Sequence, residues 1–241
     1  MASRRDQIAS GLRDVHARVR TACERAGRDP HDVTTVVVTK TFPVSDIRDL
    51  LGLGVHDVGE NRDQEARRKA VELAQPGPGL TPPHWHFIGQ LQRNKANSVA
   101  RYADYVHSVD RTELAGALQR GAVAAQRELG CFVQVSLDQG DAGVIGPRGG
   151  ATADRIIEVC EAVERAENLT LLGLMAVAPL DEPPAPAFER LAEMHDAVTR
   201  EFPAATALSA GMSHDFETAI SYGATHVRVG SAVLGERTDV R

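Results

Sequence analysis

Cysteine is scarce in this chain and shows no paired spacing. Cys23, Cys131 and Cys160 stand far apart in a sequence of 241 residues. Disulfide frameworks and thiolate metal sites both need cysteines at short or paired intervals. The sequence therefore predicts neither kind of site and no bound metal, and we expect the three cysteines to be small core residues.

Clusters of basic side chains are also missing. The chain has 27 Lys and Arg against 33 Asp and Glu, a net charge of -6, and no run of Lys and Arg long enough to follow a polynucleotide backbone. We therefore expect no nucleic-acid partner.

Long apolar stretches are absent from the start of the chain. The first 27 residues carry charges throughout, so they contain neither the apolar centre of a secretory signal nor a membrane span. We expect a cytoplasmic protein with no membrane partner.

What the sequence does contain is a regular alternation of strand and helix patterns. An amphipathic helix is predicted over about residues 5–27, where Ile8, Leu12, Val15, Val19 and Cys23 recur at intervals of three and four. Eight short apolar runs follow, each succeeded by a helical pattern. Strands are predicted near residues 34–39, 56–60, 84–89, 105–109, 131–137, 170–178, 206–210 and 226–230.

Eight strand–helix units in a chain of this length predict an α/β protein with one closed (β/α)8 TIM barrel over about residues 34–235. Parallel strands need crossover helices, and closure removes the exposed edges. The whole chain, 1–241, is then a single domain, and a doubly wound open sheet is the alternative. Loops rich in Gly or Pro are predicted at residues 74–83, 138–150 and 180–187.

Polar residues gather at the predicted strand ends, where barrel enzymes build their sites. Lys40 ends the run "VVVTK". It either extends its amine into solvent or, partly desolvated in the barrel mouth, forms a Schiff base with an aldehyde. The turns "LSAGMSHD" and "VRVGSAVLG", with Gly230 and Ser231, are ordinary loops or cradles for a phosphate.

Three other residues carry open alternatives. Arg228 alternates with two valines, so it points either into the barrel, where a buried guanidinium needs a partner, or outward to a helix acid. His86 is either a satisfied core residue or a base, while His84 and His107 show no metal-ligand arrangement. Asn61 either caps the next helix or hydrogen-bonds a ligand.

Seven segments, in order, resemble the signature segments of the pyridoxal phosphate homeostasis protein family. They are "VVVTKTFP", "VGENRDQEA", "WHFIGQLQRNK", "VHSVD", "GLMAVAP", "LSAGMSHDFETAI" and "VRVGSAVLG". The resemblance covers about residues 34–235 and implies a barrel similar to the N-terminal domain of bacterial alanine racemase, with pyridoxal 5'-phosphate bound as an imine on Lys40. It implies no direct contact from Met175 or His86. The other implied cofactor-binding positions are Arg228 at the pyridine nitrogen, Asn61 near the ring, and Ser209, the backbone around Met212, Gly230 and Ser231 at the phosphate.

The chain departs from the family pattern at three places. Phe42 stands where many members have lysine, and Gln90 replaces a residue that is often histidine. The loop after the fifth strand reads "DAGVIG" where relatives often carry Lys-Ser-Gly. The implied cofactor pocket survives these changes, whereas any role of the extra lysines is lost.

The family resemblance implies a carrier of pyridoxal phosphate that influences amino-acid and keto-acid balance. It implies no catalytic residues, and apo enzymes that use the cofactor are the expected partners. The alternative is an enzyme: a weak amino-acid racemase or a Schiff-base aldolase acting on a sugar phosphate. Related racemases need a lysine and a tyrosine from a second domain, and Tyr102, Tyr105 and Tyr222 are not at predicted strand ends. An aldolase usually has its lysine on a later strand, which disfavours it. A third class of function is an interaction scaffold that uses the barrel only as structure. Separately, we expect the protein to be a monomer.

Overall fold

The protein folds into a closed barrel of eight parallel strands in the order β1-β2-β3-β4-β5-β6-β7-β8. The computed structural model describes residues 2–138, 149–179 and 182–236. The strands are β1 (Thr34–Val38), β2 (Asp57–Glu60), β3 (His84–Phe87), β4 (Tyr105–Val109), β5 (Leu129–Gln134), β6 (Leu169–Met175), β7 (Ala207–Ser209) and β8 (His226–Val229). The predicted barrel is confirmed, and the open doubly wound sheet is wrong because β1 pairs with both β2 and β8.

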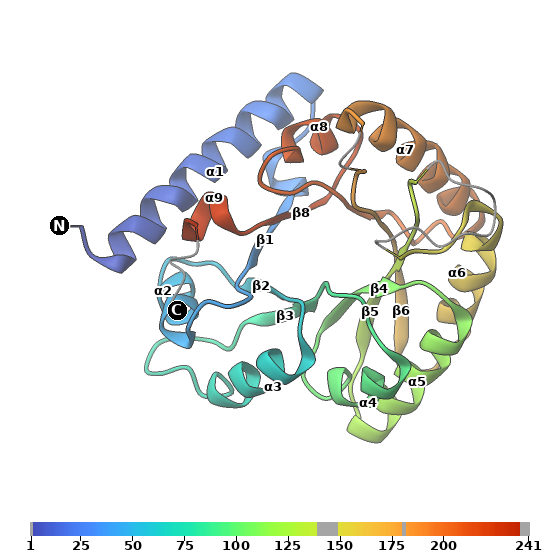
Figure 1. Cartoon of the computed structure of the whole chain (residues 1–241), viewed down its shortest axis with the longest axis horizontal. Coiled ribbons are helices and arrows are strands. Elements are labelled where there is room, and N and C mark those ends of the chain that lie inside the picture. Colours follow the sequence, from blue (N-terminus) through green and yellow to red (C-terminus); the bar gives the residue numbers. More distant parts are fainter. Residues whose placement is uncertain (1, 139–148, 180–181, 237–241) are drawn as a thin grey trace.

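Helices surround the barrel on its outside, as Figure 1 shows. The α-helices are α1 (Arg4–Ala26), α2 (Val44–Leu51), α3 (Asp63–Glu72), α4 (Ala96–Val99), α5 (Thr112–Ala125), α6 (Ile156–Glu164), α7 (Pro184–Glu201), α8 (Phe216–Ser221) and α9 (Ser231–Leu234). Three short 3-10 helices in the described residues are η1 (Pro30–Asp32), η2 (Arg93–Lys95) and η3 (Ala153–Arg155). No helix in the described part of the chain is both long and apolar enough to span a membrane.

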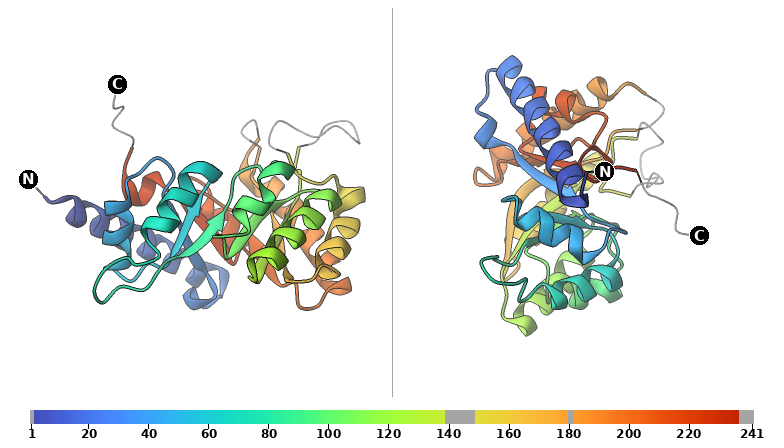
Figure 2. Two further views of the ribbon diagram at one scale, coloured as in Figure 1. Left: turned by 90° about the horizontal axis from the view of Figure 1, so that it is seen from below. Right: turned by 90° about the vertical axis from the view of Figure 1, so that its left-hand side faces the viewer.

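The N-terminal helix α1 confirms the predicted amphipathic pattern. Its start carries a capping box between Ser3 and Asp6, and it ends at Gly27, whose φ of 66° suits glycine. Its apolar side is buried against α8, α9 and the outside of β1 and β8. Figures 1 and 2 show α1 lying along one flank of the barrel, next to α9.

The interior of the barrel is polar and aromatic. His86, His107, Phe132 and His226 come from β3, β4, β5 and β8, yet each ring lies 4.3 to 6.4 Å from at least two of the others. Only the barrel interior can bring four such strands together. The cysteines follow the prediction: Cys23, Cys131 and Cys160 are free and buried.

Strand and loop boundaries differ from the prediction at several points. Strand β5 ends at Gln134, not near 137, because the chain then leaves the ladder and Val135 bridges to Ala151. The predicted loop 74–83 has no helix or strand. The predicted loop 180–187 is wrong from Pro184 onward, where α7 begins. Most of the predicted loop 138–150 lies outside the described residues.

Candidate functional site

The predicted site residues follow four strands that are neighbours in the closed barrel. In the β1–β8 pair, Val36 is opposite Arg228 and Val37 is opposite Val229. Lys40 after β1 and Gly230 after β8 therefore emerge at the same carboxyl end, and a Cβ at Gly230 would lie 3.4 Å from the carbonyl oxygen of Val38. The closure thus brings together residues from opposite ends of the sequence.

Lys40 lies two residues beyond the end of β1 and is exposed. The expectation of a partly desolvated amine is therefore wrong for this structure. The apolar strand ends at Thr39, which is fully buried, and the chain reaches the surface one residue later. Lys40 thus lies at the rim formed by the carboxyl ends of the strands.

A buried lysine holds the backbone just before Lys40. Lys69 is 1% exposed, and its Nζ donates to the carbonyl oxygen of Thr39 at 2.8 Å and to Glu60 Oε1 at 2.7 Å. Thr39 Oγ1 donates to the same Glu60 oxygen at 2.7 Å. Burial raises the pKa of Glu60, and the nearby Lys69 only partly offsets this effect.

A second carboxylate holds the backbone just after Lys40. Glu65 Oε1 accepts the backbone N–H of Thr41 at 2.7 Å and lies 2.7 Å from Lys69 Nζ. Thr41 has a φ of 70°, which is unfavourable for a β-branched residue. Lys69 and Glu65 together therefore fix the peptides on both sides of Lys40 and hold a strained turn beside it.

Arg228 points into the barrel, as the inward alternative predicted. It is 4% exposed; its Nη1 donates to Ser209 Oγ at 2.6 Å and its Nη2 to the carbonyl oxygen of Ala176 at 2.8 Å. Burial lowers the pKa of Arg228 to about 10, so the guanidinium stays charged at neutral pH. A buried cation whose described partners are a hydroxyl and a carbonyl can still donate to a neutral ring nitrogen.

Asn61 has a buried side-chain oxygen that the described protein leaves without a hydrogen bond. It does not cap α3, which begins at Asp63 with Arg62 as N-cap. Its Oδ1 is buried and has no hydrogen-bond partner among the described residues. A Cβ at Gly89 would lie 2.2 Å from the Asn61 carbonyl oxygen, so Gly89 is needed for this close approach. An unsatisfied amide oxygen at a strand end fits a ligand-binding role.

The expected phosphate positions fall into two groups. Gly230 and Ser231 form the N-cap and first residue of α9, where backbone N–H groups lack intrahelical acceptors. Met212 is 36% exposed at the same end, although its backbone N–H donates to Asp215 Oδ1 at 2.6 Å. Ser209 is fully buried beneath Arg228, so the structure does not bring its side chain to this surface.

Several residues that support the site were not singled out from the sequence. Ser213 connects the two turns, because the Gly230 N–H donates to its Oγ at 3.4 Å. Glu65 and Lys69 were missed although they show the i,i+4 spacing of a helical ion pair. No group of three or more His, Cys, Asp or Glu side chains suited to a metal ion is present in the described segments.

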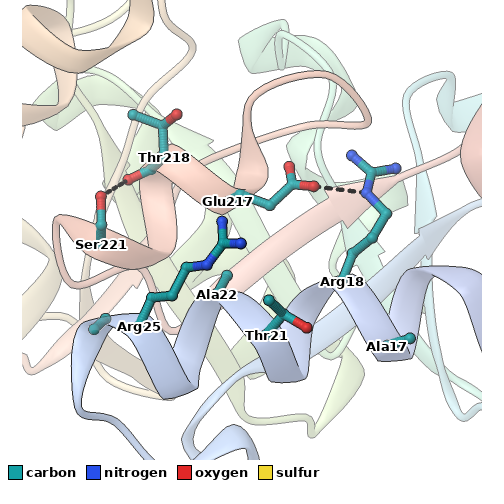
Figure 3. Close-up of a pocket in the computed structure, with 9 residues that line it drawn as sticks. Ala17, Arg18, Thr21, Ala22, Arg25, Glu217, Thr218 and Ser221 are labelled. Atoms are coloured by element: carbon teal, nitrogen blue, oxygen red, sulfur yellow. Dashed lines mark hydrogen bonds and ion pairs between the residues drawn. The ribbon is translucent and has the colours of Figure 1, made fainter.

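A separate groove lies on the outside of the barrel between α1 and α8. Figure 3 shows Arg18 reaching across it to Glu217, with Nε 2.6 Å from Oε1. Its volume is about 530 Å³ and none of the expected cofactor residues lines it. The groove is therefore distinct from the site at the carboxyl ends of the strands.

Comparison with known proteins agrees with this geometry. The family "Alanine racemase, N-terminal domain" matches residues 12–238. The "Pyridoxal phosphate homeostasis protein" of Mycobacterium tuberculosis is 43% identical over 252 residues, covering 97% of this chain and 94% of that protein. PipY of Synechococcus elongatus, solved with PLP bound, has a TM-score of 0.79 at 30% identity, covering 95% of this chain and all (100%) of the other. Alanine racemase of Corynebacterium glutamicum shares the fold, with a TM-score of 0.64 at 14% identity over 95% of this chain and 64% of that one. The chain therefore belongs to the alanine racemase N-terminal domain family and, within it, to the pyridoxal phosphate homeostasis proteins.

Proposed function

We propose that this protein binds pyridoxal 5'-phosphate through Lys40 and serves in the storage and delivery of that cofactor inside the cell. The observation that carries the proposal is the buried Arg228, which is held at the carboxyl end of β8 by Ser209 and Ala176. The names of the relatives and the PLP-bound structure of PipY support the same assignment.

The residues of the site divide the binding between them. When bound, the cofactor supplies an aldehyde that a lysine amine captures reversibly. Lys40 provides the amine, Arg228 donates to the ring nitrogen, and Asn61 lies beside the ring. Gly230 and Ser231 provide backbone donors for the phosphate, and the turn at Met212 lies at the same end of the barrel. Because a guanidinium keeps its protons, Arg228 leaves the ring nitrogen unprotonated and the ring a weak electron sink.

The placement of the tyrosines supports a carrier over a racemase. Tyr105 is the first residue of β4, Tyr102 precedes that strand, and Tyr222 follows α8 ahead of β8. All three lie toward the amino ends of strands, away from Lys40. A racemase needs a second base facing the lysine across the substrate, and no tyrosine of this chain occupies that position. The proposed role therefore includes no appreciable turnover. As part of the same proposal, apo enzymes are the recipients of the cofactor and the protein is a monomer in the cytoplasm.

Reduction of the loaded protein tests this function directly. The lysines of the sequence are Lys40, Lys69 and Lys95, and Lys69 is buried and occupied. We expect a visible absorption band on adding pyridoxal phosphate, loss of the band in Lys40→Ala, and borohydride trapping on Lys40. The exposed Lys95→Ala variant is the matched control and should keep the band. A wild-type protein that takes up no cofactor would refute the proposal, and sustained α-proton exchange of amino acids would show an enzyme.

A further inference from the structure

A continuous chain of hydrogen bonds crosses the barrel interior from Arg228 to the opposite end of the strands. Arg228 Nη1 donates to Ser209 Oγ at 2.6 Å, and Ser209 Oγ lies 2.9 Å from His107 Nδ1. His107 Nε2 lies 2.9 Å from His86 Nδ1, and His86 Nε2 lies 3.0 Å from Asp57 Oδ1.

The middle of this chain is shielded from water. Ser209 and His107 are fully buried, and His86 is 1% exposed. Tyr105 stacks on His86 at 4.4 Å, and Phe132 stacks on His107 at 4.3 Å. Unpaired polar atoms are costly in such surroundings, so each hydrogen bond of the chain must have one donor and one acceptor.

The two ends of the chain fix its direction. Arg228 can only donate, and the Asp57 carboxylate can only accept. Burial raises the pKa of Asp57, but hydrogen bonds from His86 and His84 outweigh that effect and lower it overall. Burial also lowers the pKa of His86 and, more strongly, that of His107. The chain thus runs between a fixed cation and a fixed anion through two neutral imidazoles.

Only one arrangement of protons satisfies every link. Neutral His86 must place its proton on Nε2, because a bare Nε2 would face the Asp57 carboxylate. His86 Nδ1 then accepts from His107 Nε2–H, which leaves His107 Nδ1 as an acceptor. Ser209 therefore donates its only hydroxyl proton to His107 and offers Arg228 a lone pair.

We infer that Asp57, His86, His107 and Ser209 form a directional chain that positions the Arg228 guanidinium from the far end of the barrel. Asp57 is the first residue of β2 and lines a cavity of about 460 Å³ between the amino ends of strands and η1. It is a positioning residue that acts through two histidines, and Ser209 belongs to this chain, not to the phosphate cradle. The proton assignment stands on this structure alone, whereas the effect on the cofactor rests on the proposed function.

Nitrogen NMR of the full-length protein, with nitrogen-labelled histidines and no cofactor, tests the proton assignment. At pH 7.5 we expect both His86 and His107 to be neutral with the proton on Nε2. The signals of each ring are assigned by their disappearance in His86→Gln and in His107→Gln. Asp57→Ala should abolish the fixed preference of His86 for Nε2–H. His84→Ala is the matched control, because His84 contacts the same Asp57 oxygen at 3.2 Å from outside the chain. A proton on Nδ1, or a charged ring, at either wild-type histidine would overturn the inference.

Titration with pyridoxal phosphate tests the positioning role. Asp57→Ala should weaken cofactor binding roughly three- to tenfold, as the loss of one supporting hydrogen bond implies, while His84→Ala should leave it unchanged. In a Ser209→Ala background the same Asp57 change should have an effect of less than about twofold, because the chain is already cut. Equal effects in both backgrounds would overturn the positioning role. A wild-type protein that binds no cofactor would refute the proposed function. The NMR result would still show whether the hydrogen-bonded chain has the inferred arrangement of protons.

Discussion

Lys69 is a cation held away from water by the Thr39 carbonyl oxygen beside Lys40 and by two carboxylates, one from β2 and one from α3. Its contacts to Glu60, Glu65 and the Thr39 carbonyl oxygen are each 2.7 or 2.8 Å long. Taking such charges out of water is expensive, so the pair is weak evidence of net stabilisation. Removing one partner is a different matter, because the remaining buried carboxylate then has no counter-charge.

We expect Lys69→Met to lower the free energy of unfolding by about 3–5 kcal/mol, the range for breaking a buried ion pair. It should also slow the capture of pyridoxal phosphate by Lys40, since the peptides beside Lys40 are no longer fixed. Urea unfolding and stopped-flow absorbance measure the two effects. Arg48→Ala, which breaks an exposed pair with Glu72 at 3.3 Å, is the control and should cost at most about 1 kcal/mol. Equal losses in the two variants would contradict this account.

At the residue scale the sequence predicts where the site residues lie along the strands better than it predicts their exposure and hydrogen-bond partners. The alternation in "HVRVG" predicts that Arg228 points away from Val227 and Val229, and of the two alternatives left open the inward one is correct. Of the two alternatives for Lys40, the partly desolvated amine does not match its exposed position. Exposure at a strand end depends on where the chain turns out of the barrel, and Glu65 and Lys69 on α3 hold that turn. The partners of Arg228 could not be predicted either, since Ser209 lies on β7 and Ala176 follows β6, and only the folded barrel brings both to Arg228.

The contact between α1 and α9 connects the N-terminal helix to the expected phosphate cradle. A Cβ at Gly11 would lie 2.6 Å from the carbonyl oxygen of Val233 and 3.0 Å from its Cα. Arg4 reinforces the contact, donating to the carbonyl oxygen of Leu234 at 3.0 Å and to Asp46 of α2 at 2.6 Å. The position of Ser231 at the start of α9 therefore depends on how closely α1 approaches.

We expect Gly11→Ala to destabilise the protein by about 1–3 kcal/mol, because the added methyl group meets backbone that cannot move aside cheaply. This loss should outweigh the gain in helix propensity, which is at most about 1 kcal/mol. Gly116→Ala in α5 is the matched control, since its nearest neighbour there is the Arg120 guanidinium at 3.6 Å; it should stabilise. Urea unfolding measures both, and a stabilising Gly11→Ala would refute the close contact.

At the element scale the hydrophobic period was sufficient for α1 and for all eight strands, but not for the start of α7. The Pro-rich composition of segment 180–187 predicts a loop, although Pro184 and Pro186 occupy the first turn of α7. Proline suits the first turn of a helix because no N–H is needed there. Composition alone does not distinguish that position from a loop.

Closure of the whole barrel creates an interior that no single strand pattern reveals. Alternation predicts which residues point inward, but the partners of His86, on β3, come from β2 and β4. Three neutral histidines in that interior make the stability of the whole fold depend on pH. Burial lowers the pKa of His107 well below its usual value, lowers that of His86, and lowers that of His226 to about 4.

These shifts predict a loss of stability in mild acid. In the unfolded chain each histidine takes up a proton as the pH falls through about 6.5, whereas the folded protein takes it up only at a lower pH. At His226 the unfolded state therefore binds more protons between about pH 6.5 and pH 4, which lowers the unfolding free energy by about 1.4 kcal/mol per pH unit there. His86 and His107 add to this slope below about pH 6.5 until each takes up its proton in the folded protein. Urea unfolding from pH 7.5 to 4.5 measures the slope. His226→Asn should reduce it by one histidine's share, and the exposed His31→Asn should not; a slope unchanged in His226→Asn would show that His226 is protonated equally in both states.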